Sequence, residues 1–168
     1  MKKLESGRSM VEMLGVLAII GVLSIGGIAG YVLSMNRYRA NAILDAANKY
    51  ASLVFSSYQT WIAQGNAVSD WTGLSKDGSK LTFPADSDVS INGTDGAPET
   101  GIVANTVYVS VTFPNLDICE TALSVAGYDA DTGVTLPSGM TGNKTCTEGN
   151  AGTDGVKPAS VVLPFSQS

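Results

Sequence analysis

The chain has 168 residues, of which 44% are hydrophobic and only 15% are charged, and its net charge is −5 at pH 7. This length accommodates one domain of ordinary size with an appendage. The chain contains no histidine and only ten basic residues, so histidine-based catalysis, histidine metal ligation and a basic stripe for nucleic acid are excluded. The low charge content indicates that part of the chain lies in a membrane or in a packed phase.

The first element is a short basic leader followed by a long apolar segment. Lys2 and Lys3 open the leader, and residues 13–35 carry no charged side chain, with only Ser24 and Ser34 as polar breaks. As a helix, these 23 residues measure about 35 Å, slightly more than the roughly 30 Å hydrocarbon core of a bilayer. The segment is therefore predicted to be a membrane-spanning helix.

A secretory signal peptide is the alternative interpretation of this segment. Gly27 and Ala29 supply the small residues that signal peptidase requires, which would allow cleavage after Ala29. Two features argue against that interpretation. The apolar run is longer than the roughly 7–15 residues of a typical signal peptide, and Glu12 stands at its start, where a signal peptide has no use for a carboxylate.

The junction before the apolar segment reads Gly7-Arg8-Ser9-Met10-Val11-Glu12. It resembles the processing site of the type IV prepilin family, and the resemblance is specific over residues 1 to about 60 and loose beyond them. It implies that a prepilin peptidase removes residues 1–7 by cutting after Gly7, so that Arg8 becomes the first residue and Glu12 the fifth. Members of the family usually begin the mature chain with Phe or another apolar residue, often N-methylated, and Arg8 departs from that pattern.

Glu12 is the candidate assembly residue. A lone carboxylate in an apolar bundle is costly unless it is paired. In the family the corresponding Glu is retained inside a filament, and the terminal ammonium of Arg8 from a neighbouring subunit is its natural partner. Such a pair would align an incoming subunit axially. The alternative is an ordinary single-pass anchor in which Glu12 lies at the level of the lipid headgroups.

Helical periodicity continues beyond the apolar segment. No proline occurs before Pro84, so a single helix is predicted over residues 8–62. Five glycines in its first half lower helix propensity but permit neighbouring helices to approach closely. They indicate either a stalk that is designed to melt or the ordinary composition of a membrane helix. They are Gly15, Gly21, Gly26, Gly27 and Gly30. The apolar positions of the second half recur at three- and four-residue steps and predict one buried face: Ala40, Ile43, Leu44, Ala47, Tyr50, Ala51, Val54, Tyr58, Trp61 and Ile62.

The head is predicted over residues 63–168. Residues 64–101 are rich in turn-forming residues, with short apolar spots at Trp71, Leu74, residues 81–83 and residues 89–91, and are expected to form a variable loop with one or two short strands. Residues 105–113 alternate with period two and predict a strand. Residues 115–126 predict a short helix capped by Asn115 or Asp117, and residues 159–165 a final strand ended by Pro164. These elements give an α+β head with a small antiparallel sheet packed on the long helix.

Cys119 and Cys146 are the only cysteines. Beyond a bacterial inner membrane they would meet an oxidising compartment, so a disulfide loop over residues 119–146 is expected. A C-terminal disulfide loop also resembles pilins, and the helix that carries Cys119 resembles the type IVb subgroup more than the type IVa subgroup. The alternative is a pair of free thiols in a reducing cytoplasm.

The sequence contains no catalytic constellation, phosphate-binding glycine loop or paired metal-ligand spacing, so an enzyme is not expected. No cofactor is expected, although scattered acidic residues between glycines and threonines are compatible with Ca²⁺ as well as with simple loop solvation: Asp86, Asp88, Asp95, Asp129, Asp131 and Asp154.

Taken with the resemblance, these patterns imply the pilin fold and a structural function. The expected product is a homo-oligomeric helical filament at the cell surface, assembled from the bacterial inner membrane, with the head in the periplasm, by an assembly platform and its ATPase. The alternatives are a pseudopilin of a type II secretion system and a singly anchored or secreted soluble binding protein.

Overall fold

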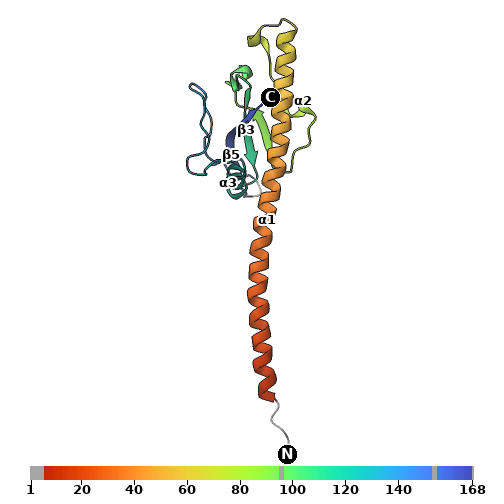
Figure 1. Cartoon of the computed structure of the whole chain (residues 1–168), viewed down its shortest axis with the longest axis vertical. Coiled ribbons are helices and arrows are strands. Elements are labelled where there is room, and N and C mark those ends of the chain that lie inside the picture. Colours follow the sequence, from red (N-terminus) through yellow and green to blue (C-terminus); the bar gives the residue numbers. More distant parts are fainter. Residues whose placement is uncertain (1–5, 95–96, 153–154, 168) are drawn as a thin grey trace, which may run out of the picture. The chain divides into compact units, whose positions relative to one another are not determined.

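The computed structural model describes residues 6–94, 97–152 and 155–167, with side chains from residue 10 onward. The chain divides into two compact units, Met1–Asn36 and Arg37–Ser168. The longest element, α1 (Ser6–Ala63), contributes residues to both (Figure 1). The long helix expected over residues 8–62 is therefore present, and its ends lie within two residues of the predicted ones. Of the expected leader, residues 1–5 lie outside the described residues.

The second unit, which we call the head unit, is an α+β domain. After α1 it contains short helical turns, a sheet and one further α-helix of ten residues. In chain order the elements are η1 (Val68–Asp70), α2 (Lys76–Ser79), β1 (Asp88–Ile91), η2 (Pro98–Gly101), β2 (Ile102–Val103), β3 (Thr106–Phe113), α3 (Leu116–Val125), β4 (Thr147–Glu148) and β5 (Ala159–Ser166).

The sheet is antiparallel, with the order β1-β3-β5-β4, and β2 pairs with β3 beside β1. β3 is central: its Val109 lies opposite Ile91 of β1 on one side and Leu163 of β5 on the other. The period-two pattern of β3 buries Val107, Val109, Val111 and Phe113 completely while the residues between them stay half-exposed. This is the alternation expected of a strand with one face on the core.

The core lies between that sheet face and the second half of α1. The predicted face of α1 is buried from Ala40 to Val54, and Leu44, Tyr58 and Trp61 pack at its margin, whereas Ile62 is 38% exposed. α3 closes the core with Ile118, Ala122 and Leu123. Asn115 caps α3, because its side chain accepts a hydrogen bond of 3.0 Å from the backbone of Ile118, which satisfies one of the free amides of a helix start.

Residues 64–101 contain the short strand β1, as expected, and Leu81 and Phe83 pack on the core from an irregular segment. One expectation about the strands is wrong, because β5 continues through Pro164 to Ser166. The Val162 amide donates outward to the Asn143 carbonyl at 2.8 Å, so Pro164, two residues further, directs its nitrogen to the same outer edge of the sheet, where it disrupts no bond to β3.

Candidate functional site

The first unit presents one continuous apolar helix surface. Fifteen large apolar side chains of α1 are each at least 51% exposed, which a soluble domain would normally bury. We call this set the apolar helix surface: Met10, Val11, Met13, Leu14, Val16, Leu17, Ile19, Ile20, Val22, Leu23, Ile25, Ile28, Tyr31, Val32 and Leu33.

By length and composition, α1 is the one helix among the described residues that is able to cross a membrane. Its most apolar window has a mean hydropathy of 2.3, and no part of that window is buried inside the structure. An apolar helix in the core of a soluble protein meets the same criterion of composition but is buried, so the exposure distinguishes α1 from that case. A signal sequence near the N-terminus is not distinguished by these properties.

Glu12 is the only charged residue between positions 10 and 35. Its side chain is exposed on α1, and it belongs to none of the ion pairs or hydrogen bonds formed by the described residues. Gly7 and Arg8 lie in the first turn of the helical backbone, while the Arg8 side chain lies outside the described part. Because residues four apart share a helix face, Arg8 and Glu12 occupy the same face of α1.

The glycines of the first unit, Gly7 aside, are not required by any contact among the residues that the structure describes. A Cβ added at Gly15, Gly21, Gly26, Gly27 or Gly30 would meet no atom within 4 Å. Their small size therefore serves no packing inside one copy, and both sequence interpretations of these residues, a weakened stalk and ordinary membrane-helix composition, remain compatible with the structure.

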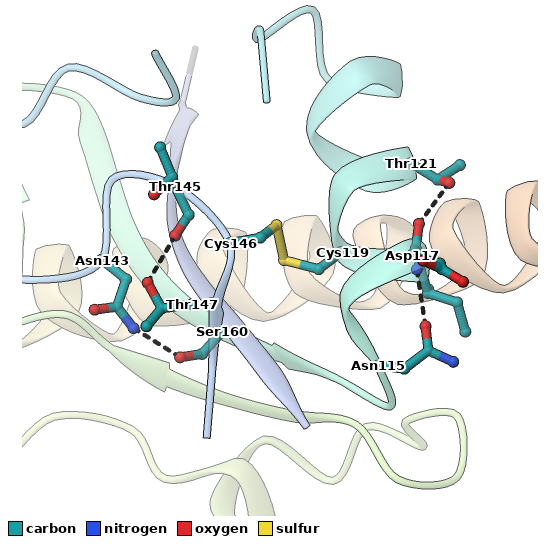
Figure 2. Close-up of a disulfide and its surroundings, with 10 residues drawn as sticks. Asn115, Asp117, Cys119, Thr121, Asn143, Thr145, Cys146, Thr147 and Ser160 are labelled. Atoms are coloured by element: carbon teal, nitrogen blue, oxygen red, sulfur yellow. Dashed lines mark hydrogen bonds between the residues drawn. A yellow bond between two sulfur atoms is a disulfide. The ribbon is translucent and has the colours of Figure 1, made fainter. Parts of the chain in front are cut away.

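The disulfide is the second feature expected from the sequence, and it is present. Cys119 of α3 is bonded to Cys146, whose neighbour Thr147 begins β4 (Figure 2). The described residues contain no free cysteine. Because the bond joins α3 to the outer edge strand of the sheet, it fixes both ends of the intervening loop.

The loop inside the disulfide is held by Val134, which is buried in the core, and by several polar contacts. Asn143 donates from its side chain to Ser160 at 2.8 Å and accepts from the Val162 amide. On the opposite side, the Asn92 side chain donates to the Thr141 carbonyl at 2.8 Å. At Gly133, whose φ is +63°, a Cβ would lie 2.0 Å from the Lys144 carbonyl oxygen, so only glycine fits this crossing. The sequence did not indicate that Asn92 and Asn143 anchor the loop.

Two of the acidic residues considered for Ca²⁺ make contacts within the head. Asp88 forms an ion pair with Lys76 at 3.2 Å. The Asp129 carboxylate accepts from the amides of Thr132 and Asp131, and these bonds lower the pKa of Asp129. Asp95 and Asp154 lie outside the described residues. Among the residues the structure describes, no three potential ligand side chains gather into a group.

Two surface clefts of the head are lined mainly by polar side chains. One cleft of about 260 Å³ lies between η2 and the disulfide loop, where Asn92, Thr94, Thr100 and Thr141 line it together with Met140. A second cleft of about 470 Å³ runs beside β1 and contains the Lys76–Asp88 ion pair. Hydroxyls and amides line the first cleft, and the second also contains the Asp77 carboxylate.

Comparison of the chain with the models of known protein families, with curated proteins and with solved structures gives no match.

Proposed function

We propose that this protein is a structural subunit of a type IV pilus-like filament, made as a precursor and cut after Gly7. In this proposal α1 spans the inner membrane before assembly, and the apolar helix surface then packs against the helices of other copies. The head is carried on the outside of the filament, in the arrangement of the pilin fold. A prepilin peptidase, an assembly platform and an ATPase act in trans.

The observation that carries the proposal is Glu12. It is an exposed carboxylate within an apolar surface whose neighbours Val11 and Met13 are 70% and 66% exposed. When that surface is covered by lipid or by other helices, the carboxylate is desolvated and needs a cation. The described residues supply none from the same chain. An amine created at Arg8 of a second copy meets this need, and it explains why the cut precedes Glu12 by so few residues.

The disulfide loop favours a surface filament over a pseudopilin of a type II secretion system. Major pseudopilins resemble this chain in the stalk but usually lack such a loop. The structure has the Cys119–Cys146 bond, and an extracellular fibre is exposed to conditions in which that covalent restraint is useful. A singly anchored or secreted binding protein is the less favoured candidate, because neither cleft described above contains groups that define a ligand.

The first test is the mature N-terminus, read by N-terminal sequencing and intact mass of the protein recovered from cells. We expect a start at Arg8. A start at Gly30 would show a secretory signal peptide, and an uncut Met1 would show a permanent anchor; either result contradicts the proposal.

The second test is a Glu12→Ala variant compared with a Glu5→Ala variant. Both lose one carboxylate near the N-terminus, but Glu5 belongs to the segment that the cut discards. We expect Glu12→Ala to remain in the membrane and to be absent from sheared surface fibres, while Glu5→Ala assembles normally. A normal fibre yield from Glu12→Ala would contradict the role of Glu12.

A further inference from the structure

The two parts of the chain differ in charge. Residues 40–168 contain five basic and thirteen acidic residues, a net charge of −8, whereas residues 1–39 contain five basic and two acidic residues, a net charge of +3. Heads with this charge repel one another when they are crowded together. A filament of such heads therefore needs cations at the contacts between copies.

Three of the seven basic side chains of the head unit are paired within the subunit. Lys49 pairs with Asp45 at 2.6 Å, Lys76 with Asp88, and Lys157 with Glu148 at 3.3 Å. Arg37 and Arg39, by contrast, are exposed and join none of the ion pairs or hydrogen bonds of the described residues. They lie in the first turn of the head unit, directly before Ala40, the first fully buried residue of its core.

α3 carries an unpaired acidic face. Asp117 and Glu120 are three positions apart, so they project from one side of the helix. Both are exposed, and neither belongs to an ion pair of the described residues. Figure 1 shows α3 at the end of the head unit where the α1 residues of that unit begin. Two unpaired arginines and two unpaired carboxylates thus occupy the same end of one unit without meeting each other.

We propose that, in the filament, Arg37 and Arg39 of one subunit bind the Asp117–Glu120 face of α3 in a neighbouring subunit. This inference rests on the proposed function and specifies the partner of the head unit as a second copy. The contact is heterologous and propagates along a filament.

The chemistry of the four residues suits this contact. A guanidinium binds carboxylates through paired, directed hydrogen bonds and is weakly hydrated, so it is favoured over lysine at interfaces. The other anionic surface near the arginines would be phospholipid headgroups. The second copy is favoured because its carboxylates are held in fixed positions on a helix, while residues 40–168, with their net charge of −8, are repelled by an anionic bilayer.

The experiment is a charge swap in the full-length chain, measured as sheared filament per cell. Arg37→Glu/Arg39→Glu and Asp117→Arg/Glu120→Arg each place like charges across the contact, and we expect each to reduce the yield at least about tenfold. The four substitutions together should restore the yield to within about threefold of the wild type. Lys80→Glu/Lys144→Glu is the matched control, because it makes the same charge change at exposed lysines outside the contact and should leave the yield unchanged.

Precursor level, membrane retention and disulfide formation are measured for every variant. Asp117→Asn/Glu120→Gln is made alongside Asp117→Arg/Glu120→Arg, because it removes the two charges without adding long side chains that could impair folding. It should give an intermediate yield. Unchanged yields in both reversals, or no recovery in the combined variant, would overturn the contact while leaving filament formation itself intact. If Arg37→Glu/Arg39→Glu were lost from the membrane before assembly, the arginines would be assigned to lipid headgroups, and the contact would again be overturned. Absence of filaments from the wild-type chain would reject the proposed function, and the contact with it.

Discussion

The two units of the chain use the same helix in opposite ways. In the head unit, α1 buries Ala40, Ile43, Ala47, Tyr50 and Val54 to 1% exposure or less. In the first unit, α1 leaves every large apolar side chain from Met10 to Leu33 at least half-exposed. The apolar side chains of α1 are therefore buried by the same chain in the head unit, whereas those of the first unit remain exposed.

The difference shows what each unit requires. The head unit has its own sheet, core and covalent bond, so it contains what an independent domain needs. The first unit consists of a helix alone, and an isolated apolar helix gains stability only from lipid or from other helices. The head unit should therefore fold without the first unit, whereas the first unit should need lipid or other helices.

The largest effect is expected from separating the two units. A chain that begins at Arg37 should be a soluble, folded monomer, whereas the chain with the apolar helix surface should need detergent. Burial of fifteen large apolar side chains is favourable by on the order of ten kcal/mol or more, which drives aggregation when no membrane is present. Size-exclusion chromatography with light scattering and circular dichroism would measure both states.

The full-length chain is the control for that truncation. An unfolded or aggregated head would show that the head unit depends on residues 1–36, and a full-length monomer without detergent would show that the apolar helix surface has a partner within the chain. Either result would remove the contrast between the units.

A smaller effect is expected from opening the disulfide, which belongs to the head unit alone. Cys119→Ser/Cys146→Ser should lower the free energy of unfolding by up to about 3.6 kcal/mol, because the bond closes a loop of about 28 residues in the unfolded chain. The contacts of the loop through Asn92 and Asn143 are polar and exposed, so they replace little of this stability. Urea denaturation of the head unit gives the difference.

Reductant provides an internal control for the disulfide prediction. It should destabilise the wild-type head and leave the serine variant unchanged, and it should not alter membrane retention of the full-length chain. Equal stability of the two proteins without reductant would mean that the loop is held by its other contacts.

The sequence predicted the parts of the fold that have a local or periodic signal. The buried face of α1 follows from its three- and four-residue spacing, and β3 follows from its alternation of Val and polar residues. Asn115 was recognised as a candidate cap because it directly precedes an apolar helical pattern. The pairing of Cys119 with Cys146 followed from their number and the expected compartment.

The remaining features depend on contacts between distant residues. β2 and β4 have two residues each and exist only because β3 and β5 offer edges beside them, so no local pattern marks them. Pro164 was read as a strand end because the sequence does not show which edge its nitrogen faces. For the candidate site, Glu12 was visible as a charge inside an apolar run, whereas Arg37 and Arg39 became notable only when the structure showed that other basic residues of the head unit are paired.

The smallest effect concerns Tyr50, which connects α1 to β1 at the edge of the sheet. Its hydroxyl donates to the Leu74 carbonyl and accepts a hydrogen bond from the backbone of Ile91 in β1. Tyr50→Phe keeps the ring but leaves both backbone groups without this partner, and we expect a loss of about 1–2 kcal/mol in the free energy of unfolding at neutral pH. A loss near zero would mean that water replaces the hydroxyl.

The same residue makes the head unit sensitive to alkaline pH. Burial raises the pKa of Tyr50 to about 12 from 10.0, and the Asp88 carboxylate adds to the rise while the Ile91 hydrogen bond opposes it. Below pH 10 the hydroxyl is protonated in both the folded and the unfolded state, so it adds no pH dependence. Between pH 10 and 12 the unfolded state releases the proton more readily, and the stability of the fold decreases as pH rises.

Urea titrations at increasing pH over this range measure the effect. The free energies of unfolding of the wild type and Tyr50→Phe should converge, with the wild type losing more stability. Parallel curves would show that Tyr50 ionises as easily in the fold as in the unfolded chain, and that α1 covers the edge of β1 less completely than its burial indicates.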